Sequence, residues 1–178
     1  MTCGLDTQEI EATISFHGHN CPGLSIGIRV AELARERLMI QDTANSLCVT
    51  ETDMCGVDAI QFLTGCSFGK GNLVHRDFGK SAFTFFNRDT GKGFRAVFLD
   101  QGRRESMDKD ARIQAIMSAG LDDIFTVEDI TAPPVRPARI LKSICCDRCG
   151  EDTMESRVRL FDGKTFCIPC FQSVEQKI

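Results

Sequence analysis

Apolar positions recur with helical spacing near the start of the chain and alternate with polar ones further on. From Pro22 to Met39, two neighbouring stripes of apolar residues three or four positions apart predict one long helix with a broad buried face. The alternating segment Ser46–Thr50 predicts a strand, and a second helical stripe follows it over Met54–Leu63. Cys55 is therefore expected in a strand-to-helix turn.

Later segments add strands and a further helix. Leu73–Asp77 is a candidate strand, and Ala82–Arg88 with Phe94–Leu99 predicts a hairpin, because both segments are rich in Phe and β-branched residues and flank a polar turn. Glu105–Ala119 has helical spacing and is followed by Gly120, a residue typical of helix ends. The long helix over Pro22–Met39 is expected to pack deep against the sheet.

Two glycines lie on one side of that long helix. Gly23 and Gly27 are four residues apart, which predicts close packing against a strand or a second helix; the alternative is room for a ligand or a partner helix. Arg35, Glu36 and Arg37 are expected on the solvent side.

Proline marks a boundary between domains. Three of the five prolines fall within Ala132–Ala138, where a backbone without regular structure is expected. The predicted organisation is a domain over residues 1–131, a Pro-rich linker over 132–142 and a small module over 143–178.

The strongest motif belongs to that small module. Two C-x₂-C pairs are separated by 17 residues, a spacing typical of a four-thiolate zinc site. A zinc-ribbon or treble-clef-like module of this size is too small to fold on its own hydrophobic core, so the metal supplies its stability. The predicted ligands of this structural zinc are Cys146, Cys149, Cys167 and Cys170.

Composition narrows the class of protein. The 178 residues are 42% hydrophobic and 26% charged, with a net charge of −4. The protein as a whole therefore lacks the positive electrostatic field that is typical of nucleic-acid-binding proteins. We expect a cytoplasmic protein, because no apolar run is long enough to cross a bilayer and the first residues are too polar for a signal peptide. Ten cysteines in such a protein indicate metal binding, redox chemistry or burial.

A second group of metal-ligating residues lies at the start of the long helix. The segment H-G-H-N-C places two imidazoles and a thiol at alternate positions of a turn, and three further cysteines, two of them candidate donors, follow within fifty residues. These donor types suit a transition metal; the alternative is a buried, hydrogen-bonded pair of side chains. The candidate ligands are His17, His19, Cys21, Cys55 and Cys66.

The same residues admit a catalytic interpretation. Cys21 precedes Pro22 at the expected helix N-terminus, where the helix dipole favours a thiolate. Cys21 would be a nucleophile, with His17 or His19 as its base and Lys70 holding an anionic substrate group. Lys70 is otherwise an ordinary turn lysine. Asp58 is positioned to accept a hydrogen bond from a ligating histidine.

Long motifs in this chain are similar to those of one known family. Residues 16–29 read F-H-G-H-N-C-P-G-L-S-I-G-I-R, residues 54–73 read M-C-G-V-D-A-I-Q-F-L-T-G-C-S-F-G-K-G-N-L, and residues 77–80 read D-F-G-K. Together with the C-terminal C-D-R-C-G-E and F-C-I-P-C-F, they resemble the E-subunit proteins of formylmethanofuran dehydrogenase and their bacterial relatives. Ser67 stands where that family often has Thr.

The resemblance implies an α+β fold in which helices cover one side of a small mixed sheet, similar to the second domain of glyceraldehyde-phosphate dehydrogenases. It also implies a homodimer and a C-terminal zinc-finger extension that some members carry. The family's redox chemistry belongs to other subunits. The expected function is therefore that of a metal-binding accessory protein, whose partners are subunits of a molybdenum or tungsten oxidoreductase.

The expected cofactors are Zn²⁺ in the C-terminal module and a second transition metal, Zn²⁺ or Ni²⁺, in the N-terminal pocket. Two other functions stay open. One is a small stand-alone enzyme that uses the thiol and imidazole groups directly. The other is a partner-binding or regulatory module that senses a metal or a small ligand.

Overall fold

The computed structural model describes residues 3–39, 45–100, 107–136 and 139–175. The chain forms two compact units, Met1–Ala138 and Arg139–Ile178. The Pro-rich segment therefore lies partly in the first unit. The carbonyl groups of Pro134 and Val135 accept hydrogen bonds from Arg76 (3.1 Å) and Arg88 (3.3 Å), so the segment is attached to the first unit at least as far as Val135.

A five-stranded mixed sheet forms one layer of the first unit. The strand order is β2-β1-β3-β4-β5; β1 and β2 run parallel, and every other neighbouring pair is antiparallel. The turn between β3 and β4 is the predicted hairpin. The strands are β1 (Ser46–Thr50), β2 (Leu73–His75), β3 (Ala82–Asn87), β4 (Lys92–Phe98) and β5 (Phe125–Ile130).

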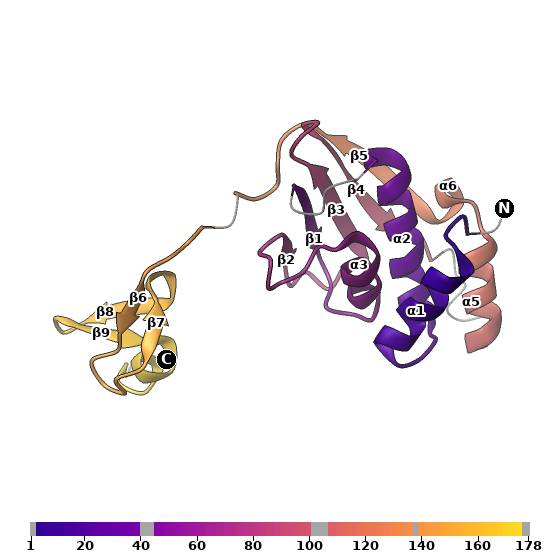
Figure 1. The fold of residues 1–178 in the computed structure, drawn as a ribbon. Helices are drawn as coiled ribbons and strands as arrows, with labels where there is room; N and C mark the ends of the chain where they lie inside the picture. The colour runs from indigo at the N-terminus through magenta and orange to yellow at the C-terminus, as the bar shows by residue number, and fades with distance from the viewer. Residues whose placement is uncertain (1–2, 40–44, 101–106, 137–138, 176–178) are drawn as a thin grey trace. The chain divides into compact units, whose positions relative to one another are not determined.

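Helices gather on one side of this sheet (Figure 1). A first hydrophobic cluster joins α2 and α3 to the sheet through residues such as Val30, Ile60 and Phe85. A second cluster, which contains Leu24 and Ile14, joins α1 to the outer side of α2 and α3. The helices are α1 (Thr7–His17), α2 (Pro22–Leu38), α3 (Gly56–Thr64), α5 (Lys109–Ser118) and α6 (Leu121–Ile124).

The predicted elements are confirmed with small shifts at their ends. The long helix begins at Pro22 as expected, with Cys21 as its N-cap. The helix expected over Glu105–Ala119 begins at Lys109, with Asp108 as its N-cap, and the residues before 107 lie outside the described ones. The α+β class, with a mixed sheet and packed helices, is confirmed.

The second unit contains two hairpins, a short 3-10 helix and a terminal helix. One hairpin turns at Asp162 and Gly163, and both turn residues have positive φ (49° and 72°), as this kind of turn requires. The small buried cluster contains Phe166 and two of the cysteines. The elements are β6 (Ser143–Cys145), β7 (Asp152–Met154), η1 (Glu155–Arg157), β8 (Val158–Phe161), β9 (Lys164–Cys167) and α7 (Ile168–Gln172).

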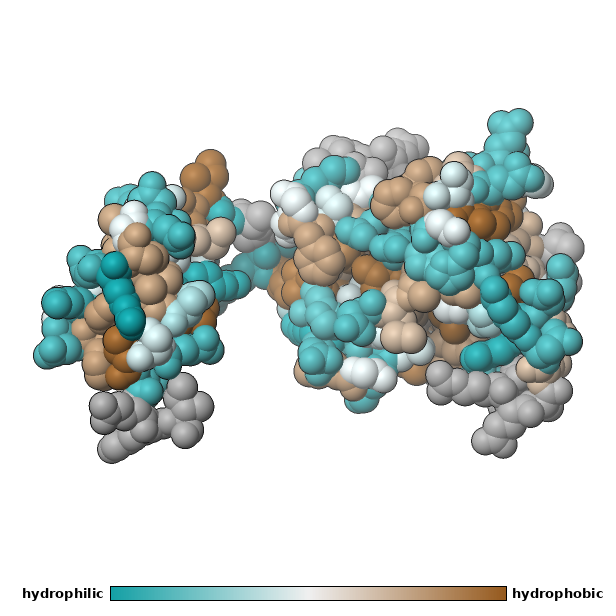
Figure 2. Space-filling view, turned by 90° about the horizontal axis from the view of Figure 1, so that it is seen from below, coloured by the Kyte–Doolittle hydropathy of each residue, from teal (hydrophilic) through white to brown (hydrophobic). Residues whose placement is uncertain are grey.

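On the face shown in Figure 2, apolar areas lie between hydrophilic residues. Phe16, Met54 and Phe62 are among the exposed large apolar side chains, and the rings of Phe16 and Phe62 lie 5.5 Å apart. Within the described ranges, no helix combines the length and the apolar character needed to span a membrane.

Candidate metal centres

Four of the predicted donors lie together where the ends of three helices meet. His17, His19, Cys21 and Cys55 each offer one ligand atom, and these atoms all lie within 4.8 Å of one another. His17 is the last residue of α1, Cys21 is the N-cap of α2 and Cys55 is the N-cap of α3. We call this group the His₂Cys₂ cluster.

The local sequence explains why the first three donors turn back on one another. Gly18 ends α1 in the left-handed conformation (φ 91°), which a residue without Cβ adopts without strain. Pro22 then occupies the first turn of α2, where its missing N–H leaves no partner unsatisfied. The short turn between the two helices therefore contains His19 and places Cys21 beside His17.

Contact between two helices brings Cys55 to the same place. Gly27 of α2 faces Gly56 of α3 so closely that a Cβ on Gly27 would lie 2.2 Å from the carbonyl oxygen of Gly56. One turn earlier, a Cβ on Gly23 would lie 3.3 Å from the Cβ of Cys55. The predicted close packing of this glycine face against a second helix is thus confirmed, and it sets the separation between Cys21 and Cys55.

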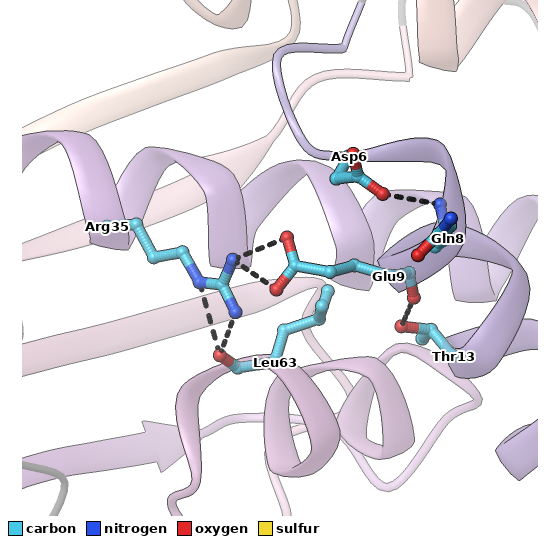
Figure 3. Close-up of polar contacts among 6 residues, drawn as sticks. All are labelled: Asp6, Gln8, Glu9, Thr13, Arg35 and Leu63. Carbon is cyan, nitrogen blue, oxygen red and sulfur yellow. Dashed lines mark hydrogen bonds and ion pairs between the residues drawn. The ribbon is translucent and has the colours of Figure 1, made fainter.

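Arg35 joins the three helices that supply these donors (Figure 3). From α2, its Nη1 donates to both carboxylate oxygens of Glu9 in α1 (2.9 and 3.0 Å), and its Nε and Nη2 donate to the carbonyl of Leu63 in α3 (3.2 and 2.7 Å). The expectation that Arg35 lies simply on the solvent side is wrong. Helical periodicity shows only which face of the helix carries an arginine. It does not show whether the side chain points into water or donates hydrogen bonds to two neighbouring helices.

Asp58 orients the first histidine. Its Oδ2 lies 2.7 Å from Nδ1 of His17, which confirms the predicted hydrogen bond and leaves Nε2 of His17 4.0 Å from the Sγ of Cys21. A carboxylate on the far nitrogen is the usual partner of a metal-binding imidazole, because it selects the tautomer and the ring orientation.

The electrostatics of the cluster favour a cation. Burial raises the pKa of the Cys55 thiol, and the adjacent Cys21 thiol and the Asp58 carboxylate raise it further. A divalent ion reverses this effect, since it stabilises thiolates directly. A tetrahedral ion bound at about 2.0–2.3 Å holds its ligand atoms less than about 4 Å apart. The four donor atoms lie within 4.8 Å of one another, so small side-chain movements bring them to these distances. The residues therefore fit a transition metal.

Two other predicted residues lie elsewhere. Cys66 is fully buried in the hydrophobic core close to Cys48, where burial raises the pKa of its thiol. Lys70 is exposed, and its Nζ donates to the carbonyl of Gly65 (2.8 Å), the residue that caps the C-terminus of α3. The structure thus brings neither Cys66 nor Lys70 into the His₂Cys₂ cluster.

The second unit holds the Cys₄ cluster, formed by Cys146, Cys149, Cys167 and Cys170. The four sulfur atoms lie within 4.8 Å of one another. The first pair lies between β6 and β7 and the second at the start of α7, a treble-clef-like arrangement. Backbone N–H groups of Cys149 and Cys167 lower the pKa of Cys146 to about 6, whereas the Cys167 thiol and burial raise the pKa of Cys170 to about 12. A zinc ion fits these four donors and leaves no open position.

Comparison with known families gives the same division of the chain. Residues 16–134 match the FmdE model, described as "Molybdenum formylmethanofuran dehydrogenase operon". The chain belongs to the FmdE family. Residues 139–176 match the prokaryotic dksA/traR C4-type zinc finger, so the Cys₄ cluster lies in a zinc-finger domain. The predicted family and its C-terminal zinc-finger extension are confirmed.

Proteins similar to this FmdE chain include a curated relative and a solved structure. A "Probable S-adenosyl-L-methionine-binding protein" of Archaeoglobus fulgidus is 29% identical over 187 residues; the match covers 87% of this chain and 50% of that protein. The chain thus spans about half the length of this curated relative. The crystal structure of a "tungsten formylmethanofuran dehydrogenase subunit e (fmde)-like protein" from Syntrophus aciditrophicus has a TM-score of 0.73 and is 23% identical, and the match covers 98% of this chain and 96% of that one. This likeness shows the fold.

Proposed function

We propose that this FmdE-family protein is a metal-binding accessory protein of a molybdenum or tungsten oxidoreductase system. The main support for this proposal is that the ends of three helices bring together His17, His19, Cys21 and Cys55. The mixed nitrogen and sulfur donors suit Zn²⁺ or Ni²⁺. The name of the structural relative supports the choice of system.

The chain's own residues give this centre its properties. Asp58 holds the His17 ring in place, and the N–H of Leu24 donates to the sulfur of Cys21 (3.4 Å), which fixes the position of that sulfur. The two thiolates balance the charge of a divalent ion. When bound, such an ion supplies Lewis-acid chemistry at the end of the helical layers.

The zinc finger is proposed to be a docking module. Its four thiolates leave no coordination position for a substrate, so its role is structural. Leu160 is 78% exposed on β8 next to Arg159, and an exposed apolar residue beside a cation suits contact with another protein surface. A homodimer in the cytoplasm, in contact with oxidoreductase subunits, is the assembly we propose.

A thiol-based enzyme is the second candidate. The observation in its favour is the 4.0 Å separation between the Sγ of Cys21 and Nε2 of His17, a nucleophile and a base on one buried turn. In this function Cys21 of the metal-free protein reacts selectively with an alkylating reagent. In the metal-binding function, bound metal protects both Cys21 and Cys55 from alkylation.

Metal content of the full chain tests the proposal. We expect two equivalents in the unmodified protein and one in a C21S/C55S variant, whose zinc finger is intact. A matched C146S/C149S variant is expected to keep the equivalent bound by the His₂Cys₂ cluster. One equivalent in the unmodified protein and one in C21S/C55S would refute a metal centre in the first unit.

A further inference from the structure

The donors of the His₂Cys₂ cluster are not held equally firmly. The His17 side chain is 10% exposed, and its Nδ1 is tied to Asp58 at 2.7 Å. Cys21 is buried, caps α2 and accepts the N–H of Leu24. Neither side chain can leave the cluster without breaking a hydrogen bond inside the protein.

Cys55 is held by the backbone around it. It is the N-cap of α3, and the Gly27–Gly56 contact allows no sliding of α3 toward α2. Cys55 also lies against Gly23 of α2. His17, Cys21 and Cys55 therefore form a rigid three-donor set.

His19 differs from these three. It is exposed, and it lies in the turn that follows the left-handed Gly18. Within residues 3–39, 45–100, 107–136 and 139–175, no hydrogen bond holds its ring; its contact is with the ring of His17, at 4.5 Å between centroids. An imidazole that binds metal almost always has a second hydrogen-bond partner that fixes it, and His19 lacks one among these residues.

The charges indicate what can replace it. Two thiolates neutralise a divalent ion, and a histidine ligand is neutral, so an exchange of His19 for another neutral donor leaves the net charge of the centre unchanged. Two thiolates and one imidazole with an open fourth position are a donor set that catalytic zinc uses. The rigid set of three donors is therefore sufficient to retain the metal.

We infer that His19 is an exchangeable ligand, and that a small neutral nitrogen or oxygen donor binds the metal in its place. This inference rests on the proposed metal centre. It makes the His₂Cys₂ cluster a site for a neutral ligand group, in contrast to the closed Cys₄ cluster. His17 and His19 have opposite roles although they are the same residue type, two positions apart.

Cobalt substitution of the full chain tests this difference, with Co²⁺ and imidazole as the probes. Visible absorption of the C21S/C55S variant gives the zinc-finger contribution, which is subtracted. H19A is expected to keep the Co²⁺ of the first unit with affinity weakened about tenfold or less, whereas H17A weakens it at least about 100-fold, because the ligand and its carboxylate-oriented geometry are both lost. H19Q repeats the measurement of Co²⁺ affinity with a side chain that is polar and longer than that of alanine.

Imidazole then measures the exchange itself. Added imidazole is expected to shift the cobalt absorption of H19A saturably, and at a lower concentration than in the unmodified protein, where His19 competes for the position. Loss of Co²⁺ from both H19A and H19Q, equal to that in H17A, overturns the inference; so does an H19A spectrum that imidazole leaves unchanged. Equal Co²⁺ content in the unmodified protein and C21S/C55S shows instead that the proposed metal centre is absent.

Discussion

Replacement of Gly27 by Ala is the most direct test of how the fold builds the His₂Cys₂ cluster. The new methyl group would lie 2.2 Å from the carbonyl oxygen of Gly56, 2.5 Å from its Cα and 2.7 Å from its carbonyl carbon. These atoms are backbone, so no side-chain rotation relieves the clash. The N-terminal end of α3 must move about 1 Å from α2 before ordinary van der Waals contact is restored.

Two opposing terms decide the cost of G27A. Ala in the middle of a helix is favoured over Gly by about 1 kcal/mol, whereas overpacking of a close contact costs typically about 1–3 kcal/mol and more where the backbone resists. We expect the clash to dominate, with a net loss of about 1–2 kcal/mol and a fall of about 2–8 °C in the melting temperature of the first unit.

The effect on metal binding is expected to exceed the effect on stability. A shift of about 1 Å between Cys21 and Cys55 is several times the tolerance of about 0.2 Å in metal–ligand distances. Thermal unfolding and metal content per chain measure the two effects. G69A is the matched control, because a Cβ on Gly69 meets no atom within 4 Å and its φ lies outside the left-handed region. Stability and metal content equal to those of G69A would refute the role of this contact.

Three further predictions concern single interactions. D58N is expected to weaken metal binding by the His₂Cys₂ cluster about 10–100-fold, because His17 loses its charged partner, and competition with a chelator measures this. Arg95 donates hydrogen bonds to both carboxylate oxygens of Glu51 (2.6 and 2.8 Å) and so lowers its pKa; E51Q removes the negative charge and one of these two acceptor oxygens. A carboxyl whose pKa is lower in the folded than in the unfolded state stabilises the fold at pH values above the unfolded pKa of about 4.3. This stabilisation is lost as the pH falls through the folded pKa. Denaturant titration should show a loss of about 1–2 kcal/mol at pH 7, moderated because Arg95 is 31% exposed, and a loss that becomes smaller as the pH falls through the folded pKa of Glu51. C146S is expected to unfold the zinc finger and release its zinc while the first unit melts unchanged, which calorimetry of both proteins would check; a shifted first-unit transition would contradict this independence.

Local patterns were sufficient for several elements and for one complete site. The stripe over Pro22–Met39 predicted α2 because buried helix faces repeat every three to four residues, and the spacing of the cysteines predicted the Cys₄ cluster. In that cluster each pair of sulfur atoms comes from one short segment, so sequence spacing and spatial distance are closely related. The strand β5 and the hairpin β6–β7 gave weaker signals, since each is short and mostly exposed on one or both faces.

The His₂Cys₂ cluster was only partly accessible from the sequence. The turn His17–Cys21 is local, and its alternating donors are enough to indicate metal chemistry. Cys55 and Cys66 were both candidates, because both flank the same helix and spacing along the chain does not show which end faces α1. Tertiary structure separates them: the start of α3 meets α2 at the glycine contact, and Cys66 is buried in the core at the other end.

The sequence by itself thus determined the family, the α+β class, the zinc-finger ligands and the identity of the donor turn, since each depends on residues that are near one another in the chain. Only the tertiary structure decided that Cys55 joins the cluster, that His17 is the histidine oriented by Asp58, that Arg35 joins three helices, and that His19 is exposed without a hydrogen-bonded partner among the described residues. These properties depend on which helix ends meet. That choice is made by the packing of whole helix faces, where the absence of two Cβ atoms at Gly27 and Gly56 brings two backbones into contact.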